Sequence, residues 1–267
     1  MDNFLFTHYL LPFSGALGIS FILTILVRAL AKSRKIVDLP IGERKIHRQP
    51  VPLLGGSAIY LAFLISLFIF KDFILDGRIQ PAYLLAIGLG GFWLMLGGYL
   101  DDKYNLHPWQ QIVWPLLAVV TVILGGMEIQ YITNPAGGVI NISSGLISGL
   151  IVFFWLLGMM YTTKFLDGLD GLVSGLAAIA SIILFCVSLF WDASQSGTAI
   201  LALILAGAAL GFLFFNFYPA RIFLGEGGST FLGFALGVLS VILGAKIATA
   251  LLVMGIPILD VGWVIVR

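Results

Sequence analysis

Charged residues are scarce in this sequence. Asp, Glu, Lys and Arg make up 10% of the 267 residues, and apolar residues make up 60%. Globular proteins in water carry about 25% charged residues, so the composition excludes an ordinary soluble domain. The net charge is only +1, so charge gives no reason to expect a nucleic acid partner. The composition instead indicates a protein surrounded by lipid.

Cysteine and an N-terminal cleavage signal are also lacking. Cys186 is the single cysteine, which excludes a disulfide framework within the chain. Its place inside the apolar segment SIILFCVSLF predicts a small buried hydrophobe. The opening MDNFLFTHYLLPF has no basic segment of the kind that begins a signal peptide. We therefore expect the first apolar run to remain as a membrane span.

Long apolar runs recur along the whole chain. A run of about 20 apolar residues crosses the roughly 30 Å hydrocarbon core of a bilayer. We therefore predict an all-α fold, a polytopic transmembrane helical bundle forming one domain over residues 1–267. Segment 127–145 alternates apolar and polar residues around Asn-Pro-Ala-Gly-Gly, which predicts a small external β-hairpin. The nine predicted spans are residues 10–31, 53–70, 81–100, 110–126, 146–164, 170–191, 197–215, 229–244 and 247–266.

The basic residues predict the orientation of this bundle. If the nine spans alternate in direction, eleven of the 14 Lys and Arg residues fall on one face and three on the other. Cytoplasmic loops of membrane proteins carry an excess of Lys and Arg. We therefore expect the N-terminus outside and the loop 32–52 in the cytoplasm.

Five acidic residues stand where long apolar runs meet short polar turns. They are Asp101, Asp102, Asp167, Asp170 and Glu226. A carboxylate inside hydrocarbon costs about 2.5–3.5 kcal/mol or more, so membrane proteins rarely carry one without a use. All five fall on the predicted cytoplasmic face, where they can form one site for Mg²⁺ and phosphate.

The spacing of these acids refines the expectation. Asp101 and Asp102 are adjacent, and their mutual repulsion favours a bound cation; the alternative is a solvated helix end. Asp167 and Asp170 are three residues apart and are predicted to share a helix face. Lys164, one turn before Asp167, is expected to pair with it or to bind a phosphate.

The segment PARIFLGEGGSTFLG turns from one predicted span into the next. Gly225, Gly227 and Gly228 are expected to expose backbone N–H groups at a helix start, which suits phosphate oxygens. Glu226 adds a carboxylate beside them. Phe223 either stacks on a nucleobase or fills apolar space.

The loop DLPIGERKIHRQPVPLLGG is the most polar stretch of the chain. Its residues Arg44, Lys45 and His47 suit a pyrophosphate or an anionic lipid headgroup. The alternative is a topology signal that is attracted to anionic lipid. The prolines and the Gly55-Gly56 pair shape a defined loop, which favours a binding role.

Four ordered motifs resemble the polyprenyl-phosphate N-acetylhexosamine-1-phosphate transferases, the MraY/WecA/TagO-like integral-membrane family. DLPIGERKIHRQPVPLLGG is similar to the family's first cytoplasmic loop, and GGYLDDKYNLHPWQQ to its aspartate-pair segment. FLDGLDGLVSG resembles the segment D-G-L-D-G-L, and PARIFLGEGGSTFLG the segment P-A-x-x-F-x-G-D-x-G-S. The wording of the first loop favours the WecA/TagO branch.

The resemblance implies a reaction and its partners. A polyprenyl (undecaprenyl) phosphate attacks the β-phosphorus of a UDP-N-acetylhexosamine, and UMP leaves. The product is a lipid-diphosphate sugar for cell-wall or surface polysaccharide synthesis. The implied cofactor is Mg²⁺, with Mn²⁺ as a substitute, and the implied location is the bacterial plasma membrane with a cytoplasmic active site. The type of N-acetylhexosamine and the choice between monomer and homodimer stay open.

The resemblance also implies roles for the acidic residues. Glu226 is expected to bind the metal ion. Asp101 and Asp102 are expected to bind or orient the lipid phosphate, or to help with the metal. Asp167 is expected to contact the uridine end, with Asp170 supporting it.

Other residues are implied to bind the substrates. Phe223 is expected to stack on uracil, and the basic first loop to line the cytoplasmic entrance. The implied substrate-binding residues are Arg44, Lys45, His47, Lys103, Lys164, Phe223 and Gly228.

The chain departs from the family pattern in three places. Glu226 stands where the family has Asp, and Tyr161 and Lys164 stand where it has Asn. The family continues beyond Arg267 with a His-rich loop and further spans. We therefore expect these 267 residues alone to fold as a membrane bundle but to be inactive or strongly impaired.

Two other functions remain as alternatives. An ion-coupled transporter would use intramembrane carboxylates as relays, but it predicts acids near mid-span and broken helices in paired halves. An inactive remnant of the same fold would keep the helices without the activity.

Overall fold

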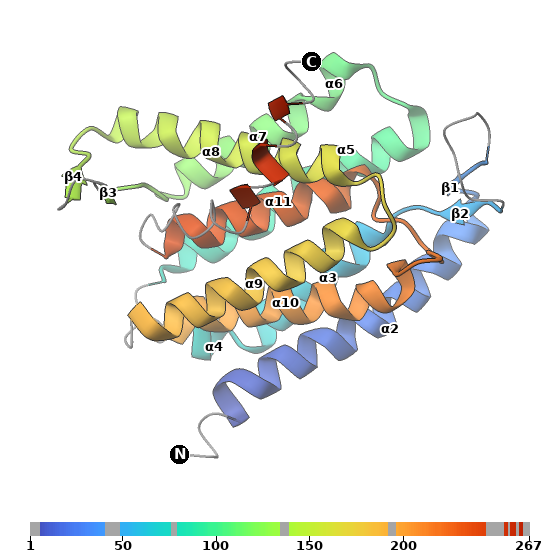
Figure 1. Cartoon of the computed structure of the whole chain (residues 1–267), viewed down its shortest axis with the longest axis horizontal. Coiled ribbons are helices and arrows are strands. Elements are labelled where there is room, and N and C mark those ends of the chain that lie inside the picture. The colour runs from blue at the N-terminus through green and yellow to red at the C-terminus, as the bar shows by residue number, and fades with distance from the viewer. Residues whose placement is uncertain are drawn as a thin grey trace.

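The computed structural model describes residues 6–40, 49–75, 79–133, 139–191, 196–243, 254–255, 257–259 and 262–263. Most of these residues form long helices that run side by side (Figure 1). The chain begins with a π-helical turn, η1 (Phe6–Leu10), and its α-helices are α2 (Leu11–Ser33), α3 (Gly55–Ile69), α4 (Lys71–Ile74), α5 (Pro81–Tyr104), α6 (Pro108–Gln111), α7 (Val113–Leu124), α8 (Gly145–Leu166), α9 (Leu172–Trp191), α10 (Ser196–Asn216) and α11 (Gly225–Ile242).

Six helices are long and apolar enough to cross a membrane, and two shorter apolar helices, 55–69 and 108–124, coincide with two other predicted spans. The predicted total of nine spans is not confirmed, because most of the ninth segment, 247–266, lies outside the described residues. Large apolar side chains such as Phe68, Leu124 and Phe154 are exposed on the bundle. Such a surface suits lipid, so the all-α multi-pass membrane fold is confirmed.

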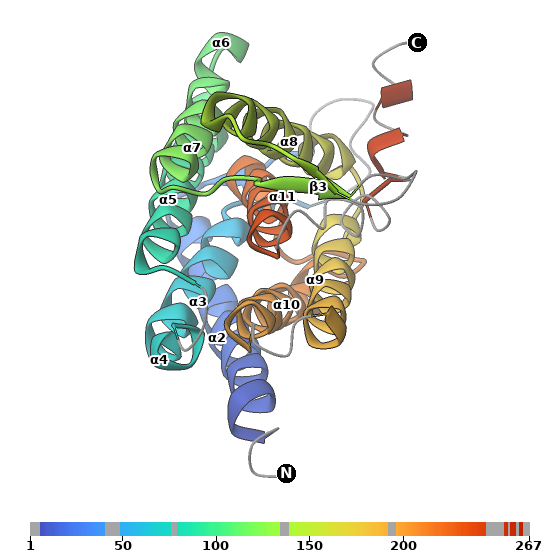
Figure 2. The same cartoon turned by 90° about the vertical axis from the view of Figure 1, so that its left-hand side faces the viewer.

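Helices α10 and α11 form the centre of the bundle. In each, 83% of the most apolar 18-residue window is buried, compared with 28–44% in the other four long helices. Helix α11 packs against α3, α5, α8 and α9, and α10 packs against α2, α3 and α9. Seen along the helices, α11 lies inside the ring that its neighbours form (Figure 2). The first turn of α11 therefore lies among the other helices at one end of the bundle.

Two small antiparallel hairpins lie at opposite ends of the bundle (Figure 1). Strands β3 (Tyr131–Thr133) and β4 (Val139–Asn141) pair within the segment where a hairpin was predicted. Strands β1 (Val37–Asp38) and β2 (Val51–Pro52) pair beside the C-terminal end of α2. The sequence did not predict this second hairpin, because each strand has only two residues.

Glycines bring three helices into backbone contact at the start of α11. A Cβ atom on Gly98 of α5 would overlap the backbone of Gly227, and one on Gly56 of α3 would overlap Gly228. Small residues allow this close approach of membrane helices. The first turn of α11 is therefore clamped between α3 and α5.

The single cysteine corrects one sequence prediction. Cys186 was predicted to be buried, but it is exposed on α9. The apolar run around it gave no sign of which helix face turns toward the protein. In a membrane this face contacts lipid, which accommodates a small apolar side chain equally well.

Candidate functional site

Asp101 organises the chain that follows α5. It lies in the last turn of this helix, which ends where Asn105 adopts a left-handed conformation with φ of 51°. The Asp101 Oδ1 atom accepts hydrogen bonds from the Leu106 backbone N–H at 2.9 Å and from Gln111 Nε2 at 3.0 Å. The short helix α6 is thereby folded back over the end of α5.

Asp102 faces the N-terminus of α11. Its Oδ1 atom accepts a hydrogen bond from the Glu226 backbone N–H at 3.2 Å. Gly225 has φ of +73°, and a Cβ atom there would collide with the Asp102 carboxylate. A negative charge stabilises the positive end of a helix dipole. The backbone N–H groups at this helix start were predicted to meet phosphate oxygens. The N–H of Glu226 instead donates to a carboxylate of the chain itself.

The glycines after Glu226 pack helices together. Gly227 and Gly228 are buried against Gly98 and Gly56. The contact of Gly228 with a substrate therefore stays a prediction. In the structure, Gly228 allows α3 to pack closely against the start of α11.

Lys164 lies in the last turn of α8 and points into the acidic cluster, which consists of Asp101, Asp102, Asp167 and Glu226. Its Nζ atom is 2.5 Å from Glu226 Oε1 and donates a hydrogen bond to Gln111 Oε1 at 3.0 Å. The side chains of Lys164 and Glu226 are 20% and 22% exposed. The pairing of Lys164 with Asp167 was one of two sequence expectations, and the ion pair forms with Glu226 instead. Only the folding of α8 against α11 could reveal this partner.

Asp167 follows α8 directly, in the turn between α8 and α9. Although the residue as a whole is exposed, nearby protein atoms displace part of the water around its carboxyl group. This partial loss of water, together with repulsion from Glu226, raises the pKa of Asp167 to about 7. Asp167 therefore belongs to the same electrostatic cluster as Glu226.

Asp170 has a different surrounding. The prediction that it shares a helix face with Asp167 is wrong, because α8 ends at Leu166 and α9 begins at Leu172. The Asp170 Oδ2 atom accepts a hydrogen bond from the Ala220 backbone N–H at 2.9 Å. Asp170 thus joins the α8–α9 turn to the loop between α10 and α11, and its part in catalysis stays a prediction.

Asn216 strengthens the same connection and was missed in the sequence. Its buried amide accepts hydrogen bonds from the Gly171 N–H and the Ser174 hydroxyl, and donates one to the Ile222 carbonyl. A polar amide at the end of an apolar run was the available signal, since a buried amide needs partners. Gln111 was also missed, because it looked like one of several polar residues after the aspartate pair.

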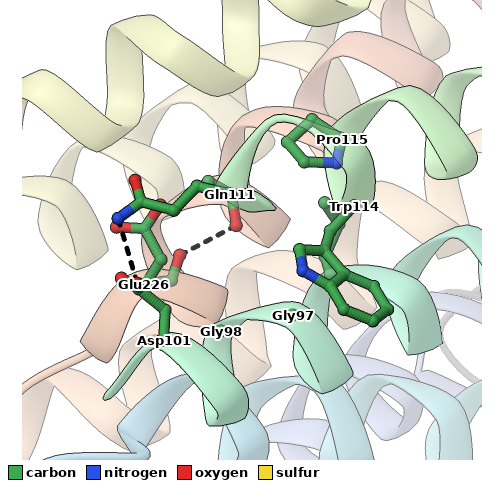
Figure 3. Close-up of a pocket in the computed structure, with 9 residues that line it drawn as sticks. Gly97, Gly98, Asp101, Gln111, Trp114, Pro115 and Glu226 are labelled. Atoms are coloured by element: carbon green, nitrogen blue, oxygen red, sulfur yellow. Dashed lines mark hydrogen bonds between the residues drawn. The ribbon is translucent and has the colours of Figure 1, made fainter. Parts of the chain in front are cut away.

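A small pocket opens between α5, α7 and α11 beside the acidic cluster. Figure 3 shows Asp101, Gln111 and Glu226 on one side and Trp114 with Pro115 on the other. The Trp114 Nε1 atom is buried and has no hydrogen-bond partner among the described residues. Within the described part of the chain, its N–H is therefore a buried donor without a partner beside the pocket. The lining residues are Leu94, Gly97, Gly98, Asp101, Gln111, Trp114, Pro115, Glu226 and Thr230.

The remaining predicted residues lie outside this pocket or outside the described part of the chain. The Lys103 ammonium lies over the rings of Tyr104 and Tyr99, at 4.8 and 5.7 Å from their centroids. The backbone of Phe223 bonds to Pro52 and Gly55, which docks its loop beside β2. Substrate contacts of Lys103 and Phe223 stay predictions. Three predicted residues lie outside the described residues: Arg44, Lys45 and His47.

The cluster suits a magnesium ion only with a substrate as a further ligand. Within the described segments, no three acidic, His or Cys side chains are close enough to hold a metal by themselves. Mg²⁺ is commonly bound by one or two carboxylates, with water and substrate phosphates completing the shell. Glu226 with one neighbouring aspartate fits that arrangement.

Comparisons with known proteins agree with the motifs. Residues 84–244 match the family model of glycosyl transferase family 4. The chain is 29% identical to the probable undecaprenyl-phosphate N-acetylglucosaminyl 1-phosphate transferase of Bacillus subtilis, over 92% of this chain and 68% of that protein. It is 31% identical to the decaprenyl-phosphate N-acetylglucosaminephosphotransferase of Mycolicibacterium smegmatis, over 80% of this chain and 55% of that protein.

A third relative differs from these two in the sugar that its name states. The phospho-N-acetylmuramoyl-pentapeptide-transferase of Streptococcus thermophilus is 30% identical over 80% of this chain and 64% of that protein. The chain thus spans between about half and two thirds of the lengths of these relatives. The matched family region covers more than half of the chain and includes all five acidic residues. The chain therefore belongs to glycosyl transferase family 4, the polyprenyl-phosphate N-acetylhexosamine-1-phosphate transferases that its four motifs predicted.

Proposed function

We propose that this protein transfers N-acetylhexosamine 1-phosphate from a UDP-sugar to a polyprenyl phosphate at the cytoplasmic face of a bacterial plasma membrane. The observation that carries the proposal is the gathering of Asp101, Asp102 and Asp167 around Glu226, which pairs with Lys164, at one end of a membrane bundle. The names of its relatives support the substrate classes.

The reaction exchanges one phosphorus–oxygen bond for another. An oxygen of the lipid phosphate bonds to the β-phosphorus of the UDP-sugar, and the bond from that phosphorus to the bridging oxygen breaks. UMP leaves with the electron pair of the broken bond. Such a transfer depends mainly on positioning and on neutralisation of charge. A magnesium ion, when bound, neutralises charge on the diphosphate.

The residues of the chain supply the positioning. Glu226 and one aspartate of the Asp101-Asp102 pair are the proposed metal ligands, and Asp167 is proposed to contact the uridine end. The Lys164 ammonium is a positive charge in direct contact with Glu226. Its placement suits a phosphate oxygen that arrives between the carboxylates. Trp114 lines the same pocket, and its buried N–H is a neutral donor without a partner among the described residues.

The transport alternative finds no support in this geometry. The acidic residues gather at one end of the bundle, with Asp101 and Asp102 in the last turn of α5 and Glu226 in the first turn of α11. A relay across the membrane would need ionisable groups at intermediate depth.

Transfer by the purified protein tests the proposal. The protein in detergent is incubated with undecaprenyl phosphate, Mg²⁺ and one of several UDP-N-acetylhexosamines, and released UMP and lipid-linked sugar are measured. We expect equal amounts of UMP and lipid product from at least one sugar, and none when Mg²⁺ is chelated. A folded protein that forms neither product with any of these sugars would contradict the proposed function.

A further inference from the structure

Gln111 lies between two parts of the acidic cluster and contacts both. It ends α6 and is half-buried. Its Nε2 atom donates hydrogen bonds to Asp101 Oδ1 and to the Leu106 carbonyl, each at 3.0 Å. Its Oε1 atom accepts a hydrogen bond from Lys164 Nζ, also at 3.0 Å. One side-chain amide therefore connects α5, the loop that follows it and α8.

The neighbours determine the orientation of this amide. Reversing it would place an NH₂ group against the Lys164 ammonium and a carbonyl oxygen against the Asp101 carboxylate. Both contacts would be repulsive, because an ammonium only donates and an ionised carboxylate only accepts. The carbonyl of Gln111 is therefore held toward Lys164.

This orientation matters because Lys164 has carboxylates on two sides. Its ammonium is paired with Glu226, and Asp101 lies directly beyond the Gln111 amide. A lysine side chain is long and flexible, so it can move between acidic partners within its reach. The Gln111 amide occupies the position in which Lys164 would meet Asp101.

We propose that Gln111 is a positioning residue that holds the Lys164 ammonium on Glu226 and keeps it from pairing with Asp101. Asp101 then receives hydrogen bonds from the neutral Leu106 N–H and Gln111 amide. Its negative charge stays directed at the pocket, while that of Glu226 is balanced by Lys164. The effect of Gln111 on turnover rests on the proposed transfer reaction, whereas its hold on Lys164 does not.

The contact between Gln111 and Lys164 can be tested without measuring enzyme activity. The protein in detergent is treated briefly with an amine-reactive acetylating reagent, and the acetylation rate of each lysine is followed by peptide mass spectrometry. In Gln111→Leu and Gln111→Asn the ammonium loses one hydrogen bond and can exchange between Glu226 and Asp101, so its amine is free more often. We therefore expect Lys164 to react about tenfold faster or more, as when a hydrogen bond to a charged group is lost. Gln111→Glu keeps an acceptor for the ammonium and should leave the rate low. Lys103, which is exposed, serves as the internal reference.

Gln110→Leu is the matched control, because the Gln110 side chain accepts a hydrogen bond from the His107 backbone N–H and, among the described residues, has none with Lys164 or Asp101. Its Lys164 rate should equal that of the parent. Thermal unfolding confirms that each variant is folded. An unchanged Lys164 rate in folded Gln111→Leu and Gln111→Asn would overturn the proposal.

Kinetics separate a positioning role from a structural one. We expect Gln111→Leu to lower kcat about 10- to 100-fold with a smaller change in KM for the UDP-sugar. If Gln111 acts through Lys164, the same substitution in a Lys164→Met protein should produce little further loss. Equal losses in both backgrounds would overturn the proposal. If the parent releases no UMP, the proposed function fails, and the acetylation result still decides the role of Gln111.

Discussion

At the scale of single residues, the cluster contains a permanent positive charge among several carboxyl groups. Lys164 balances one of them, Glu226, through a direct ion pair. Asp102 is bound to the backbone at the start of α11, and Asp101 to α6 and the loop before it. Each carboxylate therefore has a distinct surrounding, which suits distinct roles toward a metal ion and two phosphates.

Removing the Glu226 carboxylate should abolish metal-dependent transfer. We expect Glu226→Ala to lower the rate by about 10²-fold or more, since one preorganised charge at a phosphoryl-transfer site is lost. Glu226→Asp keeps the ligand type and should retain activity. Release of UMP at saturating Mg²⁺ is the measurement. Glu128→Ala, at an exposed acid near β3, is the control, and a Glu226→Ala protein as active as this control would place the metal ligand elsewhere.

Asp167 should make stability depend on pH. Its pKa in the folded protein is about 7, above the ordinary value of 3.8, so the folded state binds the proton more tightly than the unfolded chain. This contribution is fully present below the unfolded pKa and is lost as pH rises through about 7. Asp167→Asn cannot ionise, so its melting temperature relative to the parent should be higher at about pH 9 than at about pH 5.

Thermal unfolding in detergent at several pH values measures this difference. The exposure of Asp167 keeps the effect small, because water screens part of the charge. Asp72→Asn, an exposed substitution in α4 at the other end of the bundle, is the control. A constant melting difference for Asp167→Asn across this pH range would contradict the assigned pKa.

At the scale of elements, the site depends on how closely α3 and α5 approach α11. Gly98 and Gly56 allow both helices to contact the backbone of its first turn. That turn carries Glu226 and receives the Asp102 carboxylate. The packing of these helices and the geometry of the carboxylates are therefore one structural feature.

A methyl group at Gly98 should separate α5 from α11. Its Cβ would overlap backbone atoms of Gly227, which cannot move independently of the helix. We expect Gly98→Ala to destabilise the fold by about 1–3 kcal/mol, the usual cost of overpacking. Gly158→Ala is the matched control, since a Cβ there meets no atom within 4 Å and alanine favours a helix. Urea or thermal unfolding compares the two, and equal stability of both variants would disprove the close contact.

At the scale of the whole molecule, the bundle has two different ends. The acidic cluster and the β1–β2 hairpin are at one end, and the β3–β4 hairpin is at the other (Figure 1). The basic residues of the sequence predict that the end with the cluster is cytoplasmic. A UDP-sugar made inside the cell would then meet the site directly.

Cysteine labelling from outside the cell tests this orientation. In a Cys186→Ala protein, Ser33→Cys at the end of α2 should stay unlabelled by a membrane-impermeant thiol reagent. Ser143→Cys, which follows β4, should be labelled; both serines are exposed in the structure. Labelling of Ser33→Cys alone would show the opposite orientation. Labelling of both positions in intact cells would contradict any single orientation.

The sequence by itself determined the fold class, the family, the β3–β4 hairpin and the acidic residues at the span ends. The fold class, the hairpin and the place of the acids follow from local composition and from the length that a bilayer imposes, and the family follows from the resemblance of four motifs. A one-dimensional pattern therefore contains them. The same patterns could not give the partner of Lys164, the cap that Asp102 provides to α11, the separate position of Asp170 or the exposure of Cys186. These depend on how helices distant in sequence rotate and pack against one another. Only the tertiary structure decided them, because a side chain finds its partner through that packing and not through its spacing along the chain.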